Sequence, residues 1–314
     1  MRKPFDLASD HMLRVGLAKL GSDDHVLLFA THHIAFDATS QAPFLRDLAE
    51  AYEGASKAMP EIDYADFASW QVMRDSEISD EMQEWWKAEL RDLPRGQALA
   101  ADFSRPARQS YCGGTVSVTL GSEESAKVLA VAREAGATPF MLLLAAYSAL
   151  ASRYSGSGDI IVGTPASGRM PAETEEIVGL FVNLLVLRTR VRPDSTFRDL
   201  VDEVRTTTVR ALDHQEFPFE KLVEALAPER SLSQPPLFQV MFEYRNHPSA
   251  ELKIEGIVAE TFEFETGYSQ YDLHFDIRPD KSGMKVSLHY NGDLFRRESA
   301  ERILEDFHAI VTSA

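Results

Sequence analysis

The segment 138–154 restricts the fold of this chain more than any other. Its sequence, TPFMLLLAAYSALASRY, has the length of a helix and is apolar on nearly every side. A helix that is apolar all round lies either in the core of a large protein or in a membrane. Because no part of the sequence approaches the roughly 20 apolar residues of a membrane span, we expect this helix to be buried among other elements.

The segments around this helix alternate between strand and helix patterns. Two of the expected strands, DIIVGTP and LFVNLLVLRTRV, are apolar enough to be buried on both faces. Interleaved strands and helices without internal repeats indicate an α/β fold. Strands are expected at 115–120, 159–165, 180–191, 237–245, 271–277 and 285–291, and helices at 122–136, at 195–215 with Ser195 or Thr196 as cap, and from Ser299.

The first part of the chain has a pattern of its own. A strand at 11–20, a turn at 21–24 and a second strand from His25 into THHIAF indicate a hairpin. A helix capped by Ser40 is expected to follow. Residues 64–90 are expected to form one or two helices, in which three tryptophans serve as large core side chains.

The stretch from Leu93 to Gly114 shows no clear period and is rich in Pro, Arg, Ser and Gly. We expect it to connect two lobes, which agrees with a length of 314 residues at about 150 residues per domain. The expected division is an amino-terminal lobe at 1–93, a connection at 94–110 and a carboxyl-terminal lobe at 111–314.

Composition excludes several classes of protein. Lys and Arg number 32 against 49 Asp and Glu, a net charge of −17 that repels phosphate backbones and anionic membrane surfaces. We therefore expect no nucleic acid and no membrane as partner. The single cysteine, Cys112, forms no internal disulfide, and the amino terminus has no secretory signal pattern. A cytoplasmic location is expected.

The sharpest local feature is the motif His32-His33-Ile34-Ala35-Phe36-Asp37, where a strand runs into a turn. Neighbouring side chains on a strand point to opposite faces, so one imidazole at most addresses a given cavity. Asp37 is placed to orient an imidazole or to pair with a distant cation. A zinc site needs ligands on one face and a third ligand at regular spacing, and the motif meets neither condition.

Other catalytic signatures are missing from the sequence. There is no G-x-S-x-G elbow for nucleophilic hydrolysis, and no P-loop or dinucleotide fingerprint. The motif is therefore interpreted through the order of the segments around it.

Six segments follow one another in fixed order along the chain. They are PFDLASDHMLRVGL, HHIAFDATS, YADFASWQ, GTPASGRMPAETEEIVGLFVNLLVLR, HQEFPFEKLVEAL followed by PLFQVMF, and YSQYDLHFDI. Together they resemble the core motifs of condensation domains from nonribosomal peptide synthetases. The resemblance covers nearly the whole chain, whereas HHxxxD alone also fits the wider chloramphenicol acetyltransferase-like superfamily of acyltransferases.

The resemblance implies a fold and a set of partners. The fold is α/β, with two chloramphenicol acetyltransferase-like lobes in a V around a central channel. Upstream and downstream peptidyl carrier domains would insert phosphopantetheine arms into the channel from opposite sides, and an adenylation domain would be adjacent. No permanently bound cofactor is expected, because the substrates travel on those arms. The implied reaction is amide formation between two carrier-bound thioesters.

The resemblance also assigns residues. His33 matches the histidine held to act on the attacking amine, His32 its partner in the motif, and Asp37 the structural carboxylate. Arg169 matches the arginine that typically pairs with that carboxylate, and a planar guanidinium suits such a pairing. Ser40, Ala38 and Asn246 are assigned to the channel and its structural surroundings.

Two departures from the family pattern bear on activity. Ala38 stands where the family usually has Gly, which removes access to left-handed backbone conformations. The early family segment that precedes PFDLASDHML is also missing from this sequence, so we expect an incomplete amino-terminal lobe.

Alternatives within the family remain open. An epimerisation domain keeps the same HHxxxD motif, and a catalytically silent module would dock carrier proteins or a tailoring enzyme. Heterocyclisation is disfavoured, because that branch typically replaces the paired histidines with an Asp.

Overall fold

The computed structural model describes residues 3–55, 60–75, 80–94, 99–169, 171–226, 231–246, 250–262 and 264–313. They fall into two compact units. Helix α3 (Asp80–Glu89), within the segment expected for the amino-terminal lobe, belongs to unit 2. The expected division at 93 and 110 stays a prediction. Unit 1 comprises Met1–Glu77, Ser167–Val182 and Ser249–Phe262, and unit 2 comprises Ile78–Ala166, Asn183–Pro248 and Glu263–Ala314.

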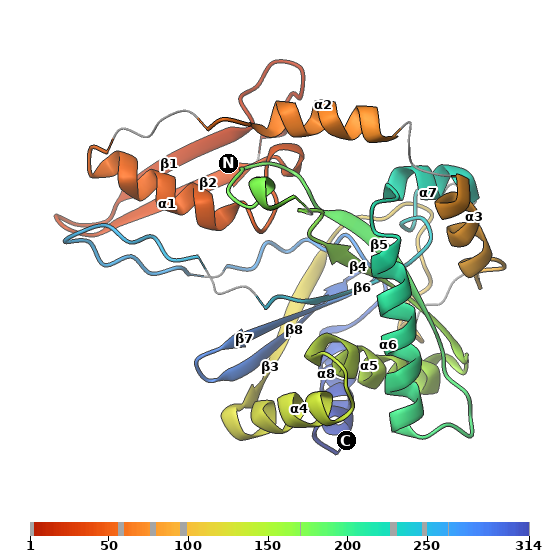
Figure 1. Cartoon of the computed structure of the whole chain (residues 1–314). Helices are drawn as coiled ribbons and strands as arrows, with labels where there is room; N and C mark the ends of the chain where they lie inside the picture. Colours follow the sequence, from red (N-terminus) through yellow and green to blue (C-terminus); the bar gives the residue numbers. More distant parts are fainter. Residues whose placement is uncertain are drawn as a thin grey trace. The chain divides into compact units, whose positions relative to one another are not determined.

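Unit 2 is built on a six-stranded mixed sheet with the order β3-β8-β7-β6-β4-β5 (Figure 1). The central strand β6 pairs in parallel with β4 and β7, and the other neighbours are antiparallel. All six strands were expected from the sequence. They span Gly113–Gly121 (β3), Asp159–Ala166 (β4), Asn183–Arg190 (β5), Val240–Tyr244 (β6), Leu273–Asp280 (β7) and Gly283–Asn291 (β8).

Helices cover one face of this sheet (Figure 1). Helix α5 contacts β4 and β6, and ten of its residues are buried, as its sequence predicts. Thr138 caps it by accepting the N–H of Met141 at 3.3 Å, and Gly156 ends it at φ 70°. The helices of unit 2 besides α3 are Ser122–Glu134 (α4), Pro139–Ser155 (α5), Phe197–Asp213 (α6), Phe219–Leu226 (α7) and Arg297–Ser313 (α8).

Strand β7 shows why the helices lie on one side. Leu273, Phe275 and Ile277 are fully buried and point to the helical face, while His274 and Asp276 alternate with them on the other face. Strand β8 alternates in the same way between buried and partly exposed side chains. The apolar core therefore lies between the sheet and its helices.

Unit 1 holds the hairpin, in which β1 (Leu13–Lys19) pairs with β2 (His25–Thr31) in an antiparallel ladder. The expected strand through THHIAF is wrong, because β2 ends at Thr31 and a 3-10 turn, η1 (His33–Ala35), follows. The other helical elements in the described residues of unit 1 are α1 (Gln41–Tyr52), α2 (Tyr64–Asp75) and the 3-10 turn η2 (Ala172–Thr174).

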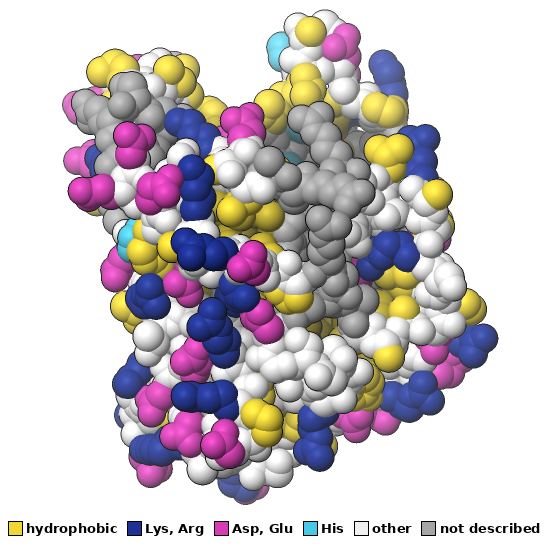
Figure 2. All heavy atoms as spheres, turned by 90° about the vertical axis from the view of Figure 1, so that its right-hand side faces the viewer, with side chains coloured by type: hydrophobic (Ala, Val, Ile, Leu, Met, Phe, Trp, Pro, Cys, Tyr) yellow, Lys and Arg dark blue, Asp and Glu magenta, His cyan; other side chains and the backbone are white. Residues whose placement is uncertain are grey.

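Two further features concern the charge of the surface and the length of the helices. On the face drawn in Figure 2, acidic and basic side chains are interspersed. Among the described residues no single helix is long and apolar enough to cross a membrane, although α4 and α5 together meet that length and composition with a bend of 98° between them.

Candidate active site

The exposed imidazole of His33 is fixed through one of its nitrogens. His33 is the first residue of η1, directly after the hairpin, and its Nδ1 lies 2.8 Å from the carbonyl oxygen of Phe36. A carbonyl oxygen only accepts hydrogen bonds, so Nδ1 carries the hydrogen. In the neutral imidazole, Nε2 is then the nitrogen with a free lone pair.

His32 has a different environment. Its Nδ1 accepts the N–H of Ile34 at 3.1 Å, and its ring meets Phe5 edge-on at 5.9 Å. The two imidazoles therefore have different environments, and the reason is not strand alternation. His32 caps the 3-10 turn that His33 begins.

Asp37 is buried and uses both carboxylate oxygens. Its Oδ1 accepts the N–H and the hydroxyl of Ser40, each at 2.8 Å, and its Oδ2 accepts the N–H of Phe181 at 3.1 Å. Its own N–H donates to the carbonyl of Gly179 at 3.0 Å. Bonds from donors on two separate stretches of chain hold this carboxylate in one place.

Arg169 pairs with Asp37, as the resemblance predicts. Its Nη2 lies 3.0 Å from Oδ1 of Asp37, and both side chains are less than 5% exposed. Its Nη1 donates to the carbonyls of Thr174 and Ile177, the latter at 2.8 Å. Its guanidinium lies 4.0 Å above the Phe181 ring, a cation–π contact. Its buried Nε has no hydrogen-bond partner among the described residues.

The structure differs from the sequence-based expectations at two neighbours of Asp37, Ser40 and Ala38. Ser40 stands at the cap position of α1 but makes no side-chain cap bond, because its hydroxyl contacts Asp37, Arg169 and Gly179 at 2.8–3.0 Å. Ala38 is exposed, and it is not among the described non-glycine residues with positive φ. The backbone at this position therefore does not require glycine.

One expected site residue, Asn246, lies in unit 2, and three residues that were not expected lie in unit 1. Asn246 is exposed just after β6 in unit 2, and its place in a channel stays a prediction. Sequence reasoning missed Gly179 and Phe181, whose backbones bond Asp37, and Tyr64, whose hydroxyl donates to the carbonyl of Leu180 between them. They lie within the segments YADFASWQ and GTPASGRMPAETEEIVGLFVNLLVLR. The sequence shows that these three residues belong to the motifs, but it does not show which residues they contact in the fold.

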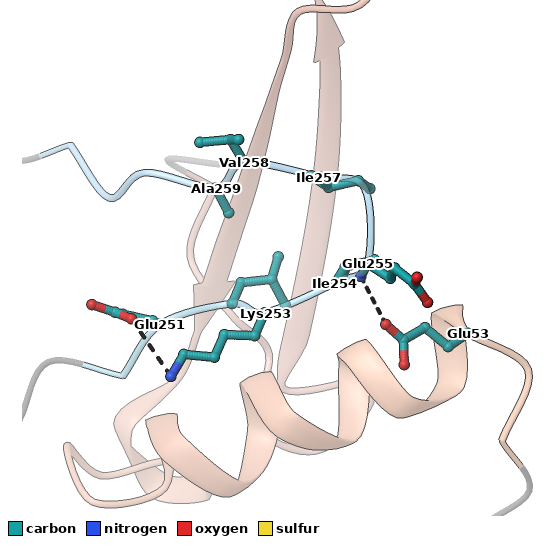
Figure 3. A pocket seen from close by; sticks show the side chains of 9 residues that line it. Glu53, Glu251, Lys253, Ile254, Glu255, Ile257, Val258 and Ala259 are labelled. Carbon is teal, nitrogen blue, oxygen red and sulfur yellow. Dashed lines mark hydrogen bonds and ion pairs between the residues drawn. The ribbon is translucent and has the colours of Figure 1, made fainter.

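An open hollow of about 600 Å³ lies elsewhere in unit 1 (Figure 3). It is lined by the end of α1 and the segment 251–259, where the N–H of Glu255 donates to Glu53 at 2.9 Å. Three glutamates and one lysine give it an acidic lining, and none of the motif residues lines it. In the described part of the chain no three metal-ligating side chains gather in a group.

Solved structures share this fold. The X-domain in complex with OxyB from teicoplanin biosynthesis is 28% identical with a TM-score of 0.88, covering 99% of this chain and 72% of that one. A four-domain nonribosomal peptide synthetase bound to AMP and glycine is 25% identical with a TM-score of 0.89, and 25% of its length is covered. The chain has the chloramphenicol acetyltransferase-like fold of condensation domains.

Sequence comparison identifies the family. The family described as "Condensation domain" matches residues 1–314, and the chain belongs to it. Tyrocidine synthase 3 of Brevibacillus parabrevis is 37% identical over 311 residues, and bacitracin synthase 1 of Bacillus licheniformis is 35% identical over 314 residues. The chain spans 5% and 6% of the length of these two proteins, and 98% and 99% of its own length is covered.

Proposed function

We propose that this chain forms amide bonds between carrier-bound aminoacyl or peptidyl thioesters in nonribosomal peptide synthesis. The observation that carries the proposal is the exposed His33, whose Nδ1 is anchored to Phe36 so that Nε2 is available as an acceptor. Asp37, in a buried ion pair with Arg169, directly follows Phe36, the residue whose carbonyl anchors that imidazole, and such support suits a catalytic group.

The reaction assigns a role to Nε2. The acceptor amine attacks the donor thioester carbonyl, a C–N bond forms, and a tetrahedral intermediate results. Nε2 of His33 accepts a hydrogen bond or a proton from the amine, and collapse of the intermediate breaks the C–S bond and releases the donor thiol. Positioning of both thioesters supplies much of the acceleration, and proton acceptance contributes about 10²–10⁴-fold where it is general-base catalysis.

Likeness to peptide synthetases supports the proposed substrates. The curated relatives include tyrocidine synthase 3 and bacitracin synthase 1, and one solved neighbour is a four-domain nonribosomal peptide synthetase. We propose that the substrates arrive on phosphopantetheine arms of upstream and downstream peptidyl carrier domains, with an adenylation domain adjacent.

A docking module is the second candidate. Two neighbours are X-domains from teicoplanin biosynthesis, at 28% and 29% identity, and one of them was solved in complex with OxyB. In this alternative the chain binds a carrier protein or a tailoring enzyme without turnover.

One experiment separates these functions. The chain is incubated with two loaded carrier proteins, and the products are weighed by intact-protein mass spectrometry, with chiral analysis of the donor residue. We expect a dipeptide on the acceptor carrier. An inverted stereocentre without a new amide indicates epimerisation, and binding without turnover indicates a docking module; either result contradicts the proposal.

The variant His33→Ala tests the role of His33 in this reaction. We expect His33→Ala to lower the rate of amide formation by at least about 10²-fold, since Nε2 is lost, while the melting temperature changes little because the side chain is exposed. His25→Ala, at an exposed histidine of β2, is the matched control. Equal rates for wild type and a folded His33→Ala variant contradict the assignment.

A further inference from the structure

The short stretch Gly179–Phe181 holds Asp37 through backbone groups. The N–H of Phe181 donates to Oδ2 of Asp37, and the carbonyl of Gly179 accepts the N–H of Asp37. Gly179 also donates its N–H to Oγ of Ser40 at 3.0 Å. A shift of this stretch is therefore expected to move the carboxylate and, through it, the end of the turn that His33 begins.

Tyr64, the first residue of α2, lies directly on that stretch. A Cβ atom built on Gly179 would be 2.2 Å from Cδ2 of the Tyr64 ring. Gly179 is not among the glycines with positive φ, so the ring rather than the backbone conformation accounts for glycine there. The Tyr64 hydroxyl donates to the carbonyl of Leu180 at 2.7 Å, and its ring meets Phe181 edge-on at 5.3 Å.

Two features keep the Tyr64 hydroxyl in place as a hydrogen-bond donor: its raised pKa and the fixed start of α2. Burial, with the charge of Asp37 adding to it, raises the pKa of Tyr64 above its usual value of 10.0, so the hydroxyl keeps its proton at neutral pH. The start of α2 is fixed by Asp63, whose Oδ1 accepts the N–H of Ala65 at 2.7 Å and of Asp66 at 3.1 Å.

We propose that Tyr64 is a positioning residue that sets the orientation of the His33 imidazole. The connection runs from the Tyr64 hydroxyl to Leu180, and from the backbone of Gly179 and Phe181 to Asp37. Phe36, the residue before Asp37, accepts the Nδ1–H of His33. The inference rests on the proposed amide-forming function and goes beyond it by naming the residue, on another element, that fixes the acceptor nitrogen.

Tyr64→Phe tests the hydroxyl alone. We expect kcat for amide formation to fall about tenfold while KM for both carrier substrates stays unchanged, since misplacement of a catalytic group affects the chemical step. Tyr52→Phe, which removes an exposed tyrosine hydroxyl at the end of α1, is the matched control and should keep the wild-type kcat. An unchanged kcat in Tyr64→Phe contradicts the proposal.

A second measurement does not depend on turnover. In ¹⁵N-histidine NMR spectra, we expect the fraction of His33 in the Nδ1–H form to fall in Tyr64→Phe and to stay at its wild-type value in Tyr52→Phe. A purely structural tyrosine leaves that fraction unchanged, and this result overturns the inference. Where the wild type itself forms no amide, the proposed function fails, and the NMR comparison alone decides the role of Tyr64.

A double-mutant cycle tests the contact between ring and backbone. We expect Gly179→Ala to lower the melting temperature strongly in the wild-type chain and much less in a Tyr64→Ala background, because the atoms that collide with the new Cβ are then gone. Equal losses in both backgrounds show that the ring does not fix Gly179 and overturn the inference.

Discussion

Asp37 and Arg169 form a buried ion pair in which each charge compensates the other. Their charged groups are nearly fully buried, 3.0 Å apart. Removal of one partner from such a pair leaves the other charge uncompensated, at a cost of about 3–5 kcal/mol. We therefore expect Asp37→Ala to lower the free energy of unfolding by that amount, measured by chemical denaturation, and to lower the melting temperature more than the exposed His33→Ala does.

A double variant that removes both charges is the control for this prediction. In the double variant Asp37→Ala/Arg169→Met no unpaired charge remains, so its loss of stability should be well below the sum of the single losses. Additive losses, or an unchanged melting temperature in Asp37→Ala, contradict the pairing as a source of stability.

His289 on β8 gives the stability of unit 2 a pH dependence. Burial lowers the pKa of His289 below its usual value of 6.5; the neighbouring side chains of His274, Arg278 and Arg245 act in the same direction and Asp276 acts against them. Between about pH 6.5 and the lower pKa of the folded state, the unfolded chain binds more protons at this site than the folded chain does, so stability falls as the pH falls through that range.

The variant that tests this is His289→Gln. We expect its melting temperature to fall less than that of the wild type between about pH 7.5 and about pH 5.5, because the proton uptake of the unfolded chain at this site is removed. His25→Gln, at an exposed histidine of β2, should keep the wild-type dependence. A wild-type slope in His289→Gln shows that other groups carry the effect.

The tryptophans of helix α3 pack it against the rest of unit 2. Trp86 is 1% exposed, and its indole N–H donates to the carbonyl of His214 at 3.2 Å; Trp85 stacks on the His214 ring at 3.7 Å. We expect Trp86→Ala to lower the free energy of unfolding by about 3–5 kcal/mol. Trp70 on α2 is 39% exposed, and Trp70→Ala should cost clearly less in the same denaturation experiment. Equal losses contradict this assignment.

Elements were predictable from sequence where local chemistry and packing agree. The all-apolar segment became the buried helix α5, Thr196 rather than Ser195 caps α6 by accepting the N–H of Asp199 at 3.2 Å, and β4 and β5 are buried on both faces. In each of these cases the local sequence pattern agrees with the packing of the fold.

The sequence predicted the residues of the candidate site and the pairing of Asp37 with Arg169, but not the other contacts of these residues. His33, Asp37 and Arg169 were identified through the motif order. The strand through the two histidines was wrong because the bonds of Asp37 to Ser40, Gly179 and Phe181 favour a turn over continued pairing. Ser40 was expected to cap α1, yet bonds to Asp37 and Gly179, the latter 139 positions away, engage its hydroxyl. Long-range partners of this kind leave no local pattern.

At the scale of the whole molecule, the two units differ in what stabilises them. The large apolar core, from Trp86 to Val311, belongs to unit 2. Among the described residues of unit 1, the buried apolar side chains are few, and Asp37, Ser40 and Arg169 make up much of what is buried beside them. The polar network of the candidate site is therefore also a main support of the unit that carries it.

The hairpin of unit 1 leaves apolar side chains uncovered. Val15 and Leu17 are 56% and 68% exposed, and the register places Leu17 opposite Leu27, which is also exposed. In the described structure β1 and β2 pair only with each other, so each strand has a free edge. Exposed apolar faces and open strand edges promote association.

We therefore expect the isolated chain to self-associate, although its net charge of −17 opposes this. In sedimentation velocity, the mean mass should rise with protein concentration. Leu17→Lys places a charge on the exposed face of β1 and should shift the distribution to monomer. Val209→Lys, at a 45% exposed residue of α6, is the matched control and should associate like the wild type. A wild-type monomer at every concentration, or equal effects of the two lysines, shows that the hairpin does not mediate association.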